Sequence, residues 1–181
     1  ELNLDAMMTN IIGAVQEASG ATKGNIMLID DQGQVVRKYL SRAGEEVVMT
    51  DQAAQEVMTE GLGGWLVQHN RGDIINNVAK DARWVRLPDD PEDSGSAIGV
   101  PLARTGRPVG VLILNNPATN YFNEVHLSLL GSIGVQITAA IENANLFEDV
   151  DEERKKLGAI LAQSSDAIIT TTEQLKISIV N

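Results

Sequence analysis

The chain has 181 residues, 43% hydrophobic and 22% charged, which suffices for one globular domain with an extension or for two very small domains. Its formal net charge of -11 opposes binding to nucleic-acid phosphates and to anionic membrane surfaces. The sequence has no cysteine, which excludes disulfides, thiolate metal ligands and thiol nucleophiles and fits a reducing cytoplasm.

The first part of the chain predicts a helix followed by a β-hairpin. Apolar residues recur at helical spacing over residues 2–19, and Gly20 provides a stop signal. Apolar runs at 26–29 and 35–40 flank a short turn-forming sequence at 30–33. Two strands joined by so short a turn are expected to pair antiparallel.

The middle of the chain reads as short elements separated by loops. Residues 51–61 predict a short helix or an irregular connection, and residues 65–69 predict a second short helix. A short strand is expected at 74–75. The stretch at 86–96 is rich in Pro, acidic residues, Gly and Ser, which is typical of a mobile loop.

A second hairpin and a long helix complete the predicted fold. Strands are expected at 97–103 and 109–114, and Asn123 can cap a helix that runs from Glu124 to at least Phe147. In this α+β arrangement the two terminal helices cover one face of an antiparallel sheet, and short helices and loops cover the other. A sheet covered in this way tends to leave a pocket between strands and loops.

Three blocks of the sequence, in this order, resemble the GAF domain, a sensory family of α+β fold. They are GLGGWLVQHNRGDIINNVAKDARW (61–84), SAIGVPLARTGRPVGVLILNN (96–116) and YFNEVHLSLLGSIGVQITAAIENANLFE (121–148). The resemblance implies a six-stranded antiparallel sheet with terminal helices on one face, a loop-covered small-molecule pocket on the other, and dimerisation through the terminal helices. It assigns residues 1–148 to a GAF-like sensory domain.

A shorter resemblance concerns the end of the chain. The sequence LGAILAQSSDAIITTTEQLKISIVN (157–181) looks like the opening of a PAS domain, although its turn lacks the usual acidic-Gly pair. We therefore expect a linker or signalling helix at 149–165 and the truncated start of a PAS-like domain at 166–181. Such a tail has too few strands to close a core of its own.

The resemblance does not identify a ligand, so the cofactor is unknown. Bilin-binding GAF domains generally attach the chromophore to a cysteine, and members that reduce methionine sulfoxide use cysteine chemistry, so neither fits this chain. Members that bind cyclic nucleotides carry an Asn-Lys pair, a Phe and then an acidic pair. Asn77, Lys80 and Phe122 are present, but His126 and Leu127 stand where the acidic pair is expected.

Candidate ligand-binding residues are those expected to line the pocket. An indole can form the wall of a site for a flat ligand and donate its N–H, although filling the core is the more common role of a tryptophan. The candidates are Trp65, Ile75, Asn76, Trp84, Ser96, Ile98 and Leu114. Because Ser96, Ile98 and Val100 share one face of their strand, these assignments are right or wrong together.

Neither catalysis nor metal binding is indicated. His69 and His126 are isolated in the sequence, which does not fit a metal or haem site. Gly61, Gly63 and Gly64 lack the spacing of a phosphate-binding loop, so a tight turn into a helix is expected there. We therefore expect no enzyme activity and no metal site in this chain.

The long helix carries a candidate pairing seam. Apolar residues follow one another at steps of four and three residues at Ile133, Ile137, Ala140, Ala144 and Phe147. After a three-residue slip the same steps continue at Val150, Arg154, Leu157 and Leu161, and the charge of Arg154 weakens the seam. Acid precedes base by four residues in the pairs Asp151–Lys155 and Glu152–Lys156. A helix with a narrow apolar seam and charged flanks tends to pair with a copy of itself. The alternative is a solvated linker helix.

We therefore expect a cytoplasmic sensory or regulatory module of a signal-transduction protein, such as a sensor histidine kinase of a two-component system. It would bind a small molecule and act as a homodimer that relays the signal through its C-terminal helix. A ligand-free dimerisation or scaffold module, favoured by apolar filling of the pocket, and the effector domain of a transcriptional regulator are the alternatives. No apolar run approaches about 18 residues, so no membrane contact is expected.

Overall fold

The chain divides into two units, Glu1–Ile141 and Glu142–Asn181. The computed structural model describes residues 4–42, 45–46, 48–86, 95–103, 106–163, 169–171 and 177–180. The helix α4 (Glu124–Gln163) begins in the first unit and continues into the second. It starts at the residue expected from the Asn123 cap, whose side-chain oxygen accepts hydrogen bonds from the backbone N–H groups of Val125 and His126.

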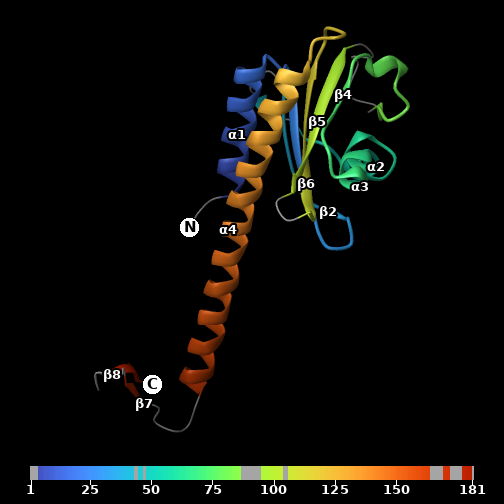
Figure 1. Cartoon of the computed structure of the whole chain (residues 1–181). Helices are drawn as coiled ribbons and strands as arrows, with labels where there is room; N and C mark the ends of the chain where they lie inside the picture. Colours follow the sequence, from blue (N-terminus) through green and yellow to red (C-terminus); the bar gives the residue numbers. More distant parts are fainter. Residues whose placement is uncertain are drawn as a thin grey trace. The chain divides into compact units, whose positions relative to one another are not determined.

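One antiparallel sheet with strand order β3-β2-β1-β6-β5-β4 forms the centre of the first unit (Figure 1). Its strands are β1 (Lys23–Ile29), β2 (Val35–Arg42), β3 (Glu45–Glu46), β4 (Asp73–Ile75), β5 (Ser96–Ala103) and β6 (Pro108–Asn116). The antiparallel pairing predicted from the two hairpins is confirmed. Five of these strands have three or more residues, and the expected count of six is reached only with the two-residue β3 at one edge.

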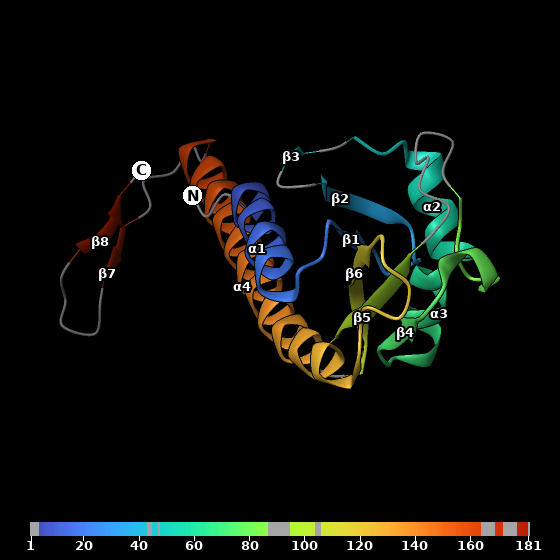
Figure 2. The same cartoon turned by 90° about the horizontal axis from the view of Figure 1, so that it is seen from above.

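Helices α1 (Leu4–Ser19) and α4 cover one face of the sheet, as expected (Figure 2). A Cβ atom added to Gly24 of β1 would lie 3.0 Å from side-chain atoms of both Ile12 in α1 and Leu114 in β6. A Cβ atom added to Gly134 of α4 would lie 3.3 Å from the side chain of Val100 in β5. The backbones of sheet and helices therefore approach closely at these two glycines.

Helices α2 (Asp51–Thr59) and α3 (Leu62–His69) cover the opposite face (Figure 2). A buried apolar cluster fills the space between these helices and the sheet, where the sequence predicted a pocket. Its members are Met27, Met49, Ala54, Met58, Leu62, Leu66, Ile75, Val78, Ala97, Val111 and Ile113. The short helix η1 (Val78–Lys80) contributes Val78 to this cluster.

The glycines at the start of α3 serve close helix packing. Gly61 is the N-cap, as expected for a turn, but Gly63 and Gly64 lie inside the helix, which begins three residues earlier than predicted. A Cβ atom added to Gly64 would lie 2.4 Å from the backbone oxygen of Met58 near the end of α2. Only a residue without a side chain lets α3 start so close to the preceding helix.

Helix α4 contains a segment, Glu124–Ala159, that is long and apolar enough by composition to cross a membrane. The segment contains no uninterrupted apolar run of that length, because Gly, Ser, Thr and Gln residues are interspersed among its apolar residues. Leu130, Ile137 and Ile141 of this segment are buried in the first unit. A helix that packs on its own sheet meets the same composition criterion, so this feature is weak evidence for a membrane span.

In the second unit, β7 (Ile169–Thr171) and β8 (Ile177–Val180) pair antiparallel as a separate two-stranded sheet. Two strands after a helix agree with the expected order of elements, but they do not show a PAS domain. The predicted turn between them and most of the predicted loop at 86–96 lie outside the described residues.

Alanine should change the stability of the chain in opposite directions at two helical glycines, one at the α2–α3 junction and one in α1. Gly64→Ala should lower the free energy of unfolding by about 1–3 kcal/mol, because its methyl group overlaps the Met58 carbonyl. Gly13→Ala in α1 should raise it by about 0.5–1 kcal/mol, because no atom lies within 4 Å of the added carbon. Urea unfolding of the whole chain measures both, and equal effects would contradict the close packing.

Candidate functional site

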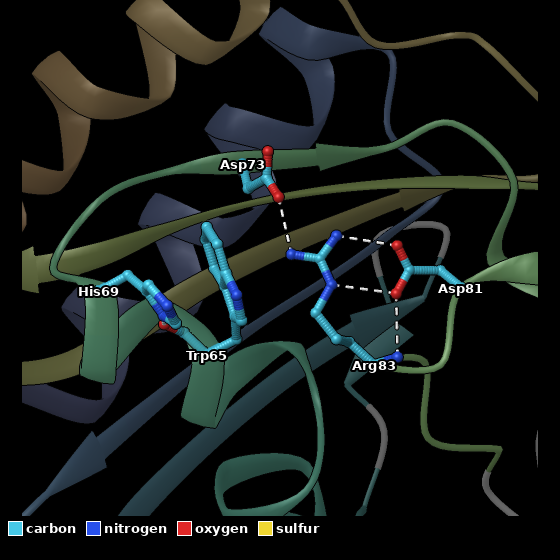
Figure 3. A network of polar contacts seen from close by, with 5 residues as sticks. All are labelled: Trp65, His69, Asp73, Asp81 and Arg83. Atoms are coloured by element: carbon cyan, nitrogen blue, oxygen red, sulfur yellow. Dashed lines mark hydrogen bonds and ion pairs between the residues drawn. The ribbon is translucent and has the colours of Figure 1, made fainter.

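Trp65 lies in a stack of aromatic and cationic side chains on α3 (Figure 3). The imidazole of His69, one helical turn away, stacks on the indole with ring centroids 4.3 Å apart and planes inclined by 18°. The guanidinium carbon of Arg83 lies 4.8 Å from the indole centroid on the opposite side. A second guanidinium, that of Arg71, lies 5.1 Å from the same ring. Both faces of the indole are thus occupied by side chains of the chain itself.

The imidazole in this stack is also fixed by a hydrogen bond. Its Nδ1 atom lies 2.9 Å from the backbone oxygen of Trp65. Because a carbonyl oxygen can only accept, Nδ1 carries the proton and donates it. His69 is therefore hydrogen-bonded to its own helix.

Two carboxylates hold Arg83 against the indole (Figure 3). Its Nη1 donates to Asp73 Oδ2 over 2.7 Å, while Nη2 and Nε donate to the two carboxylate oxygens of Asp81 over 2.8 and 3.0 Å. The backbone N–H of Arg83 also donates to Asp81 Oδ1 over 2.9 Å. Such paired, charge-assisted hydrogen bonds are among the stronger polar contacts in proteins. They tie the segment after η1 to strand β4 and helix α3.

The same contacts shift the pKa values of both partners. Hydrogen bonds from the Arg83 side chain are the main reason why the pKa of Asp81 is lowered, despite its partial burial. The hydrogen bond to Asp81 is the main reason why the pKa of Arg83 is raised. Both shifts favour the charged forms, so the two groups carry opposite charges at neutral pH.

An open groove of about 360 Å³ lies between α2 and the segment that follows η1. The residues that line it are Glu56, Glu60, Val78, Ala79, Asp81, Ala82, Trp84, Val85 and Arg86. Trp84 belongs to the same turn as Arg83, and its backbone N–H donates to the backbone carbonyl oxygen of Asp81 over 3.1 Å. Asp81 therefore belongs both to this groove and to the cluster around Trp65.

A second open groove, of about 560 Å³, lies between α1 and β2. It is lined by Asp5, Ala6, Thr9, Asn10, Lys38 and Tyr39. The Tyr39 hydroxyl donates to Asp5 Oδ1 over 2.6 Å, and burial together with this bond raises the pKa of Tyr39 to about 12. Lys38 is paired with Asp51, so the strongest polar groups of this groove already have partners.

The sheet separates the seven predicted ligand-binding residues. Ile75 belongs to the apolar cluster under α2 and α3, and Trp65 and Trp84 pack against that cluster. Asn76 is exposed, and its backbone oxygen accepts a hydrogen bond from the N–H of Asn120. The remaining three, Ser96, Ile98 and Leu114, are buried on the face covered by α1 and α4. The seven residues thus do not line one common pocket, and a ligand-binding role for any of them stays a prediction.

The structure shows why Ser96 is buried without being part of a pocket. Its hydroxyl donates to the backbone oxygen of Ala118 over 2.8 Å and accepts from the N–H of Tyr121 over 3.3 Å. These bonds anchor the connection between β6 and α4. The buried hydroxyl is therefore fully used in hydrogen bonds to two backbone groups of this connection.

Some residues of the predicted pairing seam of α4 are buried within the chain, and others are exposed. Ile137 and Ala144 are only 1% and 5% exposed and so already have packing partners within the chain. Ile133 and Ala140 are half-buried. Exposed apolar seam positions are Phe147 at 68%, Val150 at 62% and Leu157 at 54%. The side chain of Leu161 lies outside the described part of the structure.

The residues that organise the site were missing from the sequence-based candidates. Asp73, Asp81 and Arg83 hold the cluster, and Glu56 and Glu60 line the groove. The sequence DARW at 81–84 places an acid, a base and a tryptophan within one turn, which was a usable signal. Across the described ranges, no group of three or more His, Asp or Glu side chains is arranged to hold a metal ion.

Comparison with known proteins gives one family match. The family model described as GAF domain matches residues 1–142. No curated protein sequence matches the chain.

Solved structures with the same fold come from proteins of different roles. The GAF domain of an Acinetobacter phosphoenolpyruvate-protein phosphotransferase is 21% identical, covering 82% of this chain and 88% of that one with a TM-score of 0.62. Free methionine-R-sulfoxide reductase from Neisseria meningitidis, solved with its substrate, is 19% identical over 81% and 82% with a TM-score of 0.59. A methyl-accepting chemotaxis protein (residues 122 to 287) is 16% identical over 81% and 93% with a TM-score of 0.58. Identities this low show the fold alone.

The stacked Arg83 predicts that lysine cannot replace it. Arg83→Lys keeps the charge but loses the planar, two-pronged contact with Asp81, so the free energy of unfolding should fall by about 1–2 kcal/mol. Arg107→Lys, which alters a largely exposed pair with Asp31, should cost less than about 0.5 kcal/mol. Urea unfolding at neutral pH compares the two, and equal losses would contradict the role of the stack.

The lowered pKa of Asp81 predicts a pH dependence of stability. Because the folded state favours the carboxylate, Asp81 contributes stability above its ordinary pKa of 3.8 and loses that contribution as pH falls through the lower folded value. The difference in unfolding free energy between wild type and Asp81→Asn should therefore be full at neutral pH and shrink below about pH 4. Urea unfolding from neutral pH down to pH 2.5 measures this difference in unfolding free energy. A difference that stays constant over the whole range would refute the ion pair.

Proposed function

The chain belongs to the GAF domain family, and from this premise we propose that it is a sensory module of a cytoplasmic signalling protein that relays its state through helix α4. GAF domains are generally regulatory modules rather than enzymes. The presence of the same fold in a chemotaxis protein and in a phosphotransferase supports a regulatory setting. The sulfoxide reductase of the same fold shows that GAF folds can also act on small molecules.

The observation that carries the proposal is the exposed apolar stripe of α4. The helix extends over 40 residues to Gln163, past the end of the sensory unit at Ile141. Beyond that point Leu146, Phe147, Val150 and Leu157 are exposed on it. These positions differ by steps that keep them on one side of an α-helix. An exposed stripe of large apolar side chains on a solvated helix favours association with a second apolar surface.

Two ion pairs lie beside the stripe on this helix segment. Lys155 Nζ lies 2.7 Å from an oxygen of Asp151, and Lys156 Nζ lies 3.4 Å from an oxygen of Glu152. Lys155 also lowers the pKa of Asp151. Both ion pairs lie off the apolar stripe, whereas Arg154 stands on it between Val150 and Leu157. This partial segregation of charge supports a paired helix over a uniformly solvated linker. The simplest partner for such a stripe is the same helix of a second copy.

The relay would operate by a shift between two conformational states. A ligand that binds one state of the sensory unit more tightly than the other changes their populations, and only that difference in affinity can do so. The first half of α4 packs on the sheet through Leu130, Ile137 and Ile141, so a rearrangement of the sheet would move the helix. A PAS-like domain and an output domain of a two-component system after α4 fit this arrangement.

The filled core favours one alternative. Among the described residues, an apolar cluster under α2 and α3 occupies the face of the sheet where the sequence predicted a ligand. A module that dimerises without a small molecule is therefore the second candidate. Ligand binding, tested separately from dimerisation, decides between them.

The proposal predicts that a charge on the stripe abolishes self-association. Val150→Glu should weaken the dimer of the whole chain by at least about tenfold, since a buried carboxylate is costly in a helix seam. Ala159→Glu adds the same charge nine residues later, about two and a half turns away on the opposite side of the helix, and should leave the dimer intact.

Sedimentation equilibrium over a range of micromolar concentrations measures both variants against wild type. A monomeric wild type would overturn the proposed relay. Equal weakening by the two substitutions would show that overall charge, rather than the stripe, controls association.

A further inference from the structure

The end of helix α2 carries an unfavourable arrangement of charge. Glu56 and Glu60 stand four residues apart, line the same groove, and repel each other as like charges on one side of a helix. Both lie at the C-terminal end of the helix, where the backbone dipole is negative and favours cations. The last turn of α2 has no basic residue to offset them. Local arrangements that break such rules without compensation concentrate at functional sites.

The opposite wall of the groove is suited to a cation with an apolar body. Trp84 provides an indole, the aromatic ring to which cations bind best, and Val78 and Val85 provide apolar surface beside it. The other charged residues of the lining are Asp81, which is paired with Arg83, and Arg86. Apart from the paired Asp81, the lining therefore carries the two negative charges of Glu56 and Glu60 against the one positive charge of Arg86.

The size and ligand set of the groove favour a small molecule over a bare metal ion. Its volume of about 360 Å³ falls in the usual range of small-molecule sites, about 300–1,000 Å³. Divalent cations need several oxygen ligands converging on one point, and the described side chains include no such group. The groove borders the filled apolar cluster through Val78 and Trp84 but opens to the outside of α2, so a ligand can enter from solvent.

We propose that this groove binds an organic ammonium compound, with the positive nitrogen between the indole of Trp84 and the carboxylates of Glu56 and Glu60. The proposal rests on the sensory function proposed above and names the ligand class that the module detects. Binding would reach the rest of the unit through Asp81, which lines the groove and also holds Arg83 against Trp65. Val85 offers a second connection between the groove and the rest of the unit. Its side chain lies 2.9 Å from the position that a Cβ atom on Gly61 would take, at the α2–α3 junction.

Titration calorimetry of the whole chain tests the ligand class with matched probes. The cations are choline, ethanolamine and putrescine, and the neutral probe is 3,3-dimethyl-1-butanol, in which carbon replaces the charged nitrogen of choline. We expect at least one cation to bind, and choline to bind at least about tenfold more tightly than its neutral analogue. No binding of any cation, or equal binding of choline and its analogue, would overturn the proposal.

Substitutions locate the site without depending on the probe. The double variant Glu56→Gln and Glu60→Gln should lose at least about tenfold in affinity for the bound cation. Because it removes the repulsion at the end of α2, its thermal midpoint should equal or exceed that of wild type. Glu17→Gln, which removes one exposed acid from α1, should retain wild-type affinity. A similar loss in Glu17→Gln would show that overall charge, rather than the groove, attracts the cation.

The two tryptophans provide a spectroscopic readout. Cation binding should alter the fluorescence of wild type and of Trp65→Phe, in which Trp84 remains, but not that of Trp84→Phe. A response that depends only on Trp65 would place the cation at the α3 cluster and contradict the assignment.

The failure of this inference can be distinguished from failure of the proposed function. If the wild-type chain dimerises through α4 but binds none of the cations, the ligand assignment is wrong and the relay stands. If a cation binds in the groove of a monomeric chain, the ligand assignment stands and the relay is wrong.

Discussion

The central strands of the sheet are apolar on both sides, so both faces of the sheet have to be covered. In β5 the residues from Ser96 to Val100 are all buried, which is possible only if helices lie above and below them. Helices α1 and α4 cover one face and α2 and α3 the other (Figure 2). This single constraint fixes the inner side of α4 and places the apolar cluster between the sheet and helices α2 and α3. The open groove lies outside that cluster, between α2 and the segment after η1.

The sequence predicted the antiparallel pairing within the two hairpins because turn residues mark them locally. It also predicted where α4 begins, since the Asn123 cap is a local signal. The sequence did not predict which face of β5 lies under α3. Alternation shows that Ser96 and Ala97 point to opposite faces of the sheet, but both residues are buried, so burial does not tell the two faces apart. Ser96, Ile98 and Leu114 were therefore assigned to the pocket as a group, although they face α1 and α4.

The site itself was less predictable, since it depends on contacts between residues from separate elements. Trp65 was expected to offer a face to a ligand, but His69 and Arg83 occupy both of its faces. The Asp81–Arg83 contact is local to the sequence DARW, but no local pattern shows that Asp73 of β4 meets the same guanidinium. The accessible indole is Trp84, in the groove whose acidic wall comes from the end of α2.

The proposed relay depends on the exposed stripe of α4 facing the same stripe of a second copy. Distances between the two chains test this pairing most directly. Because the chain has no cysteine, a nitroxide label on Leu157→Cys or Ala159→Cys is the only label in each chain. The two positions differ by about 200° around the helix. Double electron–electron resonance should give a shorter interchain distance at residue 157 than at residue 159. A shorter distance at 159, or no dipolar coupling at either position, would contradict the paired helix.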